Sequence, residues 1–171
     1  MKNILYSPQG CWGGKNEATS SVEEQIICPL CNGSAQLVSR LTVEHFIKDE
    51  YKSNLSGKTF YSCLNKHCTI AYFNTRKNIF INISEIKEPL WYKEGANPKY
   101  ICYCAKVTEE QILNAVIYQE ARTVEDVIKL TGAMKNSNCV SNNPLGKCCR
   151  PVIESTIKKA LVLVDEKNKS F

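Results

Sequence analysis

Cysteine is the residue type in this sequence best able to do chemistry, with ten copies in 171 residues. Four of them form two close pairs, a Cys-x2-Cys and a Cys-x4-Cys, at Cys28, Cys31, Cys63 and Cys68. Two such pairs supply four soft ligands for the corners of a tetrahedron, which is how a structural zinc site is built. We expect zinc here; another metal, redox-active thiols or plain buried cysteines are the alternatives. His67, beside Cys68, could replace one cysteine as a ligand, although a lone histidine is more often a surface residue.

A second group of cysteines follows in the C-terminal half: Cys102-Tyr103-Cys104, then Cys139, then the adjacent Cys148 and Cys149. Residues i and i+2 of a strand point the same way, with a rise of roughly 6.6 Å, so both thiolates of the Cys-x-Cys could close on one iron. Four thiolates, two for each iron, satisfy a [2Fe–2S] cluster, and nearby helix N-termini would stabilise its negative charge. The alternative for the adjacent pair is that both are buried small hydrophobic residues.

The elements that must position the first group are short strands and one helix. Alternating apolar residues and turn signals predict strands at 36–40, 58–63 and 70–74, and a further strand through Ile79, Ile81 and Ile83. Thr42 is expected to cap a helix that continues to about Tyr51.

Three helices are expected around the second group. The first two begin at Thr108 and Thr123, each of which can accept a hydrogen bond from a backbone N–H three residues on. Gln111 completes a capping box at the first helix, whereas Asp126 is too short to be the usual reciprocal partner at the second. The third begins at Arg150, with a proline tolerated in its first turn.

The expected fold is therefore α+β, a small zinc-binding β/α module followed by a three-helix [2Fe–2S]-binding module. The zinc module is placed at residues 26–84 and the cluster module at residues 101–168. Between them, residues 85–100 carry two prolines and a glycine without a sustained period, and we call this stretch the connecting segment. Residues 1–25 are expected to be a flexible tail.

Charge and composition exclude several functions. The net charge of +5 comes from scattered lysines, and only four arginines are present, so neither nucleic-acid binding nor a DNA-binding regulator is expected. No apolar run approaches the roughly 18 residues of a membrane span, and no signal peptide is visible, which favours a cytoplasmic protein with reduced cysteines and no membrane contact. No phosphate-binding loop or nucleophile elbow occurs, and with only two histidines an enzyme is not expected.

The second group lies in a longer recognisable pattern. The run CYCAKVTEEQILNAVIYQEARTVEDVIKLTGA, followed by a cysteine and then Cys-Arg-Pro, resembles the [2Fe–2S] domain of bacterioferritin-associated ferredoxin. In that family two residues separate the last two ligands, whereas nine lie between Cys139 and Cys149. The combination CPLC, YSCLNKHCTIAYF, ICYC and NPLGKCC is similar to the N-terminal region of CopZ-type copper chaperones, where a zinc module precedes a [2Fe–2S] module with such an expanded loop. This resemblance covers about residues 26–165.

The resemblance implies a ligand set and a function. Cys149, the cysteine followed by Arg-Pro, corresponds to the fourth ligand, and Cys148 then points elsewhere; the cluster-binding residues become Cys102, Cys104, Cys139 and Cys149. The implied cofactors are Zn²⁺ and a [2Fe–2S] cluster that transfers one electron and could reduce Cu(II) to Cu(I). Implied partners are copper ion, a copper-transporting ATPase and a redox partner protein. The alternative is a ferredoxin-like electron carrier or an iron-handling partner without a copper role.

Full-length chaperones of this type carry a Met-x-Cys-x-x-Cys copper loop, and this sequence has none. Cys11, in the glycine-rich QGCWGG stretch, is expected to be incidental, although a mobile soft thiolate could meet a metal ion or a partner.

Overall fold

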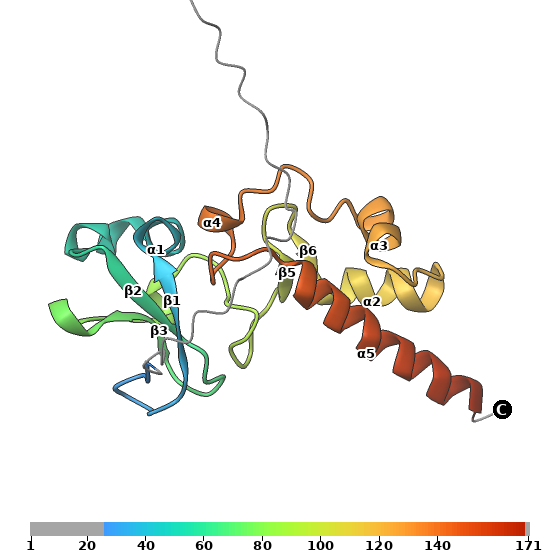
Figure 1. Cartoon of the computed structure of the whole chain (residues 1–171), viewed down its shortest axis with the longest axis horizontal. Coiled ribbons are helices and arrows are strands. Elements are labelled where there is room, and N and C mark those ends of the chain that lie inside the picture. Colours follow the sequence, from blue (N-terminus) through green and yellow to red (C-terminus); the bar gives the residue numbers. More distant parts are fainter. Residues whose placement is uncertain (1–25, 170–171) are drawn as a thin grey trace, which may run out of the picture.

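The computed structural model describes residues 26–169 and is an α+β structure with two parts (Figure 1). A four-stranded antiparallel sheet with short helices forms the first part, and a two-stranded ribbon with three longer helices forms the second. The α+β class and the order of the two parts, predicted from the sequence, are confirmed.

The sheet has the order β1-β2-β3-β4, so neighbours in sequence are neighbours in space. Its strands are Ala35–Ser39, Thr59–Cys63, Ile70–Asn74 and Ile79–Asn82, each close to the predicted position. All five residues of β3 are buried, as its apolar run predicts. The alternation of isoleucines does not extend β4 to Ile83, because Asn82 caps a 3-10 turn, Ile83–Glu85, through a capping box with Glu85.

The helix α1, Arg40–Phe46, is shorter than predicted and starts at a different cap. The hydroxyl of Ser39 accepts the hydrogen bond of the Thr42 backbone N–H at 3.1 Å, so the prediction that Thr42 is the cap is wrong. Thr42 is fully buried, and its hydroxyl donates to the carbonyl of Val140 at 2.6 Å. The chain becomes extended at Ile47, and Tyr51 belongs to a separate 3-10 helix, Asp49–Asn54.

The second part begins with the ribbon of β5, Tyr100–Cys102, and β6, Val107–Thr108. The helices α2, α3 and α5 follow at Glu109–Tyr118, Val124–Thr131 and Arg150–Lys169, with a short unpredicted α4 at Cys139–Asn142. Thr108 and Gln111 form the expected capping box. The expectation for Asp126 is wrong, because its carboxylate reaches back and accepts from the backbone N–H of Thr123 at 2.9 Å.

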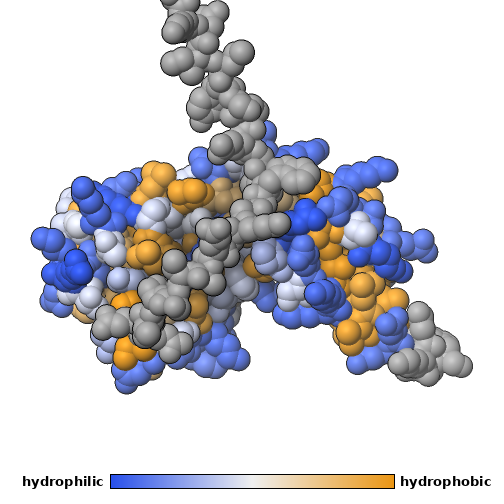
Figure 2. Space-filling view, viewed as in Figure 1, coloured by the Kyte–Doolittle hydropathy of each residue, from blue (hydrophilic) through white to orange (hydrophobic). Residues whose placement is uncertain are grey.

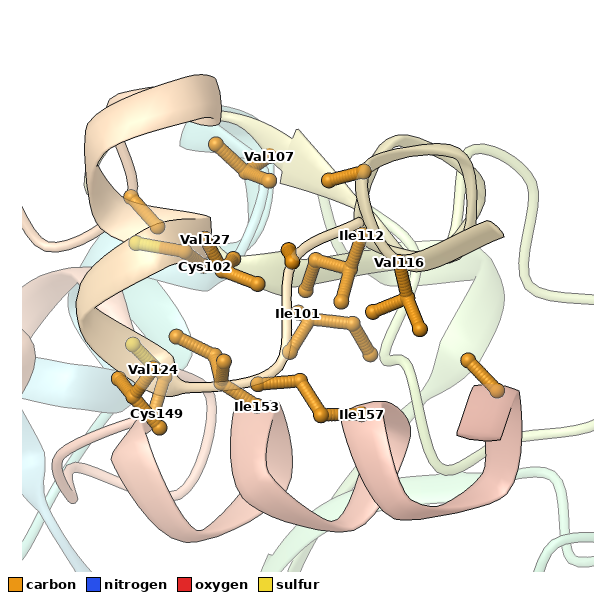
Figure 3. Close-up of a cluster of buried hydrophobic side chains, with 14 residues drawn as sticks. Ile101, Cys102, Val107, Ile112, Val116, Val124, Val127, Cys149, Ile153 and Ile157 are labelled. Carbon is orange, nitrogen blue, oxygen red and sulfur yellow. The ribbon is translucent and has the colours of Figure 1, made fainter. Parts of the chain in front are cut away.

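Each part has its own buried core. In the helical part, aliphatic side chains from β5, β6, α2, α3 and α5 pack together (Figure 3); they include Ile101, Val107, Ile112, Val116, Val127, Ile153 and Ile157. Figure 2 shows charged side chains over both parts and apolar side chains along α5, where Val162 and Leu163 are exposed. Within the described residues, no helix has the length and apolar character that a membrane crossing requires.

The loop around α4 joins the two parts, and α4 lies beside α1 in Figure 1. The Tyr72 hydroxyl, from the buried strand β3, donates to the carbonyl of Pro144 at 3.0 Å. From β1, the Gln36 side chain donates to the carbonyl of Leu145, also at 3.0 Å. The segment that carries Cys139 is therefore fastened to the sheet.

The connecting segment packs against the sheet part. Leu90 is 2% exposed and shares a core with Phe46 and Tyr103. The phenol of Tyr103 accepts from the backbone N–H of Trp91 and donates to the carbonyl of Pro89. The division of the chain at residues 26–84, 85–100 and 101–168 stays a prediction.

Candidate metal centres

The four cysteines of the first group meet at one edge of the sheet. Their sulfur atoms all lie within 4.8 Å of one another. The Sγ atoms of Cys28 and Cys68 are 4.0 Å apart, and those of Cys31 and Cys63 are 3.6 Å apart. Zinc bound to four thiolates at about 2.3 Å requires sulfur–sulfur distances of about 3.8 Å in a tetrahedron. The four thiols are therefore arranged as a tetrahedral zinc site requires, to within about 1 Å, and we call them the zinc tetrad.

Local backbone geometry sets each half of the zinc tetrad. A tight turn brings Cys28 and Cys31 together, with the Asn32 N–H bonded to the carbonyl of Cys28 at 2.8 Å. The backbone N–H of Gly33 donates to the Cys31 sulfur at 3.4 Å. A side chain at Gly33 would not fit, because its Cβ would lie 2.9 Å from the Asn65 Cβ. Cys63, at the end of β2, is thereby held against this turn.

Burial and N–H donors make the four thiols unequal. Burial raises the pKa of Cys63 to about 12 and also raises the pKa of Cys68. Burial opposes ionisation of Cys31 too, but the Gly33 N–H and the three neighbouring thiols outweigh it and lower the Cys31 pKa to about 7. A metal ion that binds here must therefore displace protons, most of them from the buried thiols.

His67 does not join the zinc tetrad. Its side chain is 60% exposed, and its Nδ1 lies 2.7 Å from the Glu94 carboxylate. The structure thus brings together the four sequence-predicted cysteines without the histidine alternative.

The second group of cysteines converges from four separate places in the chain. Cys102 ends β5, Cys104 follows in a turn, Cys139 begins α4, and Cys149 directly precedes α5. Neighbouring thiols affect each other's ionisation: Cys149 is the largest cause of the lowered pKa of Cys102, and Cys104 follows burial as a cause of the raised pKa of Cys139. Figure 3 shows the sulfur atoms of Cys102 and Cys149 on the same side of the helical core, pointing away from its aliphatic side chains.

The expectation that Cys102 and Cys104 close on one iron stays a prediction. The strand ends at Cys102, so Cys104 lies in a turn and the same-face rule for a strand does not apply. A [2Fe–2S] cluster takes two thiolates on each of its two irons, and Cys102, Cys104, Cys139 and Cys149 supply that number of ligands.

Backbone amides also point at these sulfur atoms. The N–H of Met134 donates to Cys102 Sγ, and that of Asn138 donates to Cys104 Sγ, both at 3.3 Å. The interaction with Cys149, followed by backbone N–H donors that include Met134, lowers the pKa of Cys102 to about 6. The same interaction and burial raise the pKa of Cys149, and burial raises that of Cys139 to about 12. These two amides could not be predicted from the sequence, because a backbone donor does not depend on residue type.

The adjacent cysteines differ in environment. Cys149 is 2% exposed and is the largest cause of the lowered pKa of Cys102, whereas Cys148 is half-buried. The geometry thus favours Cys149 as the member of the site. Cys11 lies outside the described residues.

Comparisons with known proteins agree with this arrangement. A CopZ-type zinc binding domain matches residues 25–87, and a BFD-like [2Fe-2S] binding domain matches residues 100–159. The chain aligns with 96% of the N-terminal domain of Archaeoglobus fulgidus CopZ in its X-ray structure, with 33% identity and a TM-score of 0.65, over 76% of this chain. The chain belongs to the CopZ family.

The full-length member of the CopZ family from Archaeoglobus fulgidus, a copper chaperone, is 37% identical over 122 residues. Those residues are 71% of this chain but only 57% of that chaperone, so the match spans little more than half of the CopZ relative. The resemblance to CopZ-type chaperones and to the bacterioferritin-associated ferredoxin domain is confirmed. The chain carries a zinc-binding domain and a [2Fe–2S]-binding domain.

Proposed function

We propose that this chain is a metal-handling redox protein that holds one zinc ion and one [2Fe–2S] cluster and reduces Cu(II) to Cu(I). The observation that supports this proposal most is the different arrangement of the two sets of thiols. Four lie within 4.8 Å of one another, whereas Cys102, Cys104, Cys139 and Cys149 form no such close group among the described residues. The first arrangement suits a single structural ion, and a [2Fe–2S] cluster distributes its four thiolates over two irons.

The zinc site would serve the fold. Its ligands would be Cys28, Cys31, Cys63 and Cys68, which leave no open position for a substrate. Three of the four are buried, as expected for a structural site. It would hold the turn after residue 26 against the ends of β2 and β3.

The cluster site would serve electron transfer. Cys102 and Cys149 would hold the inner iron, because both are buried, while the half-buried Cys104 and Cys139 would hold the outer iron. When bound, a [2Fe–2S] cluster supplies a one-electron couple. The amides of Met134 and Asn138 would stabilise negative charge on the sulfur ligands. A redox partner protein would approach from the side of Cys104 and Cys139.

Copper is the proposed substrate because the CopZ relative is a copper chaperone, and the chain aligns with 57% of its length. Soft thiolates prefer Cu(I) to Cu(II), so a protein that delivers copper to thiolate sites gains from a one-electron reduction. Partners would then be copper ion and a copper-transporting ATPase. In this proposal the chain is a binding and redox module rather than an enzyme.

A second candidate function is electron transfer or iron handling without copper. It is supported by the BFD-like match over residues 100–159.

Metal analysis tests the proposal first. Anaerobically purified protein should contain about two iron and two sulfide ions and about one zinc ion per chain. The reduced protein, mixed with Cu(II) and a Cu(I)-specific chelator, should then yield one Cu(I) for each cluster oxidised. About two zinc ions without sulfide would contradict the redox function, and a cluster that does not reduce Cu(II) would favour the second candidate.

A further inference from the structure

Residues 92–94 of the connecting segment contact the loop of the zinc tetrad although they lie outside the matched zinc binding domain, residues 25–87. The phenol of Tyr92 lies 2.6 Å from the hydroxyl of Ser62, next to the ligand Cys63. The backbone N–H of Glu94 donates to the carbonyl of Lys66 at 2.9 Å. Residues 92–94 therefore hold the loop that runs from Cys63 to Cys68.

Lys93 makes the most direct of these contacts. Its ammonium group donates to the carbonyl of Asn65 at 2.9 Å and to the carbonyl of Cys68, a tetrad residue, at 3.1 Å. Both carbonyls belong to the loop between the second pair of cysteines. The side chain thus bridges two points of the loop from beneath it.

The burial of this ammonium is unusual. Lys93 is 6% exposed and is the one buried charged residue within residues 26–166, the part whose side chains the structure describes. No carboxylate of that part forms an ion pair with it. A buried cation is costly unless an opposite charge lies nearby. The two carbonyl dipoles replace only part of the solvation free energy that the ammonium group loses when it leaves water.

The zinc tetrad supplies the opposite charge. A zinc ion with four thiolates carries a net double negative charge, which is itself costly in a buried place. We propose that Lys93 is the internal counter-ion of the tetrathiolate zinc site and positions the Cys63–Cys68 loop for metal binding. This inference rests on the zinc site of the proposed function. It extends the zinc-binding unit beyond the matched domain to residue 94.

The test compares charge with hydrogen bonding in the metal-loaded full chain. Lys93→Met removes both, Lys93→Gln keeps a donor for the carbonyls without charge, and Lys93→Arg keeps the charge. Lys87→Met is the matched control, because Lys87 pairs with Asp49 on the surface and does not touch the loop. Zinc affinity is measured by competition with a chelator of known affinity.

We expect Lys93→Met and Lys93→Gln to weaken zinc binding by about 10- to 100-fold, the range for groups that support metal ligands. Lys93→Arg and Lys87→Met should stay close to the unsubstituted protein. Unchanged zinc affinity in Lys93→Gln would show that the hydrogen bonds to the loop carbonyls are sufficient without the charge. A loss of zinc affinity in Lys93→Arg equal to that in Lys93→Met would show that the shape of the lysine side chain matters rather than its charge. Either result would overturn the counter-ion role.

A measurement on the unsubstituted chain keeps the inference testable if the variants do not fold. Acetic anhydride labels accessible amines, and mass spectrometry reads each lysine. Lys93 should be protected with zinc bound and should react like surface lysines once a chelator has removed the ion. Equal labelling in both states would contradict the proposal. If the purified chain contains no zinc at all, the proposed zinc site fails first, which separates that failure from this one.

Discussion

At the scale of single residues, the adjacent cysteines before α5 give the sharpest contrast. Cys149 is buried, with its sulfur on the same side of the helical core as that of Cys102, while Cys148 is half-buried. We expect Cys149→Ala to lose the cluster and Cys148→Ala to keep it, because only the former removes a thiol from that side of the core. Iron and sulfide content, with the visible absorption spectrum, measures the difference. The reverse result would assign the fourth ligand to Cys148.

Gly33 is a second position where a single added atom should affect stability and zinc binding. A methyl group there would lie 2.9 Å from the Asn65 Cβ and 3.2 Å from the Cys31 sulfur. Gly33→Ala should therefore lower the free energy of unfolding by about 1–3 kcal/mol, the usual cost of overpacking, and weaken zinc binding. Urea unfolding of the zinc-loaded protein measures the first effect. Ser34→Ala, at the exposed next residue, is the control, and equal stability of the two variants would contradict the clash.

At the scale of elements, the cap of α3 matters because this helix leads into the segment that donates to the cysteine sulfurs. The hydroxyl of Thr123 accepts from the backbone N–H of Asp126 at 3.1 Å. Thr123→Ala should lower the free energy of unfolding by about 1 kcal/mol, whereas Thr123→Ser, which keeps the hydroxyl, should stay within a few tenths of that of the unsubstituted protein. Chemical denaturation measures both, and equal losses would show that the methyl group matters instead.

The elements also show what the sequence could predict. The strands and the three long helices were predictable, because buried strands give apolar runs or alternation and helices begin at caps such as Thr108. The cap of α1 was misassigned, since Ser39 and Thr42 are both capping residue types three positions apart. Only the contact of Thr42 with the Val140 carbonyl separates them, and that contact joins residues far apart in the chain.

For the metal sites too, some features could be predicted from the sequence and others could not. Spacing predicted that Cys28, Cys31, Cys63 and Cys68 meet, since close pairs restrict where each thiol can lie. For the second group it could not predict that Cys104 lies in a turn rather than on the strand that ends at Cys102. Lys93 gave no signal either, as its importance depends on burial.

At the scale of the whole molecule, Tyr72 joins the sheet to the loop that carries Cys139. Its hydroxyl and the buried Pro144 carbonyl are bonded at 3.0 Å. Tyr72→Phe should lower the free energy of unfolding by about 1–3 kcal/mol, because the carbonyl is left without its donor. It should also increase hydrogen exchange in the loop. Tyr61→Phe, at a half-buried phenol of the neighbouring strand β2, is the control. Equal stability of the two variants would contradict a role of the Tyr72 hydroxyl in joining the sheet to the loop.

Zinc removal should affect the sheet part first. Structural zinc contributes folding free energy on the order of 10 kcal/mol, so a chelator should abolish protection against hydrogen exchange in residues 26–84. Hydrogen exchange read by mass spectrometry, with and without chelator, measures this loss. Retained protection would show that the ion has no structural role.

Tyr103 lies between Cys102 and Cys104, yet its phenol is bonded to Pro89 and Trp91, and its ring packs at 5.4 Å from that of Phe46 in the sheet core. The turn that presents these two cysteines is therefore shaped by the first half of the chain. Assembly should then follow a fixed order, with zinc acquired before the iron–sulfur centre can be inserted. Cells starved of zinc would accumulate this protein without iron, even when iron and sulfide are plentiful.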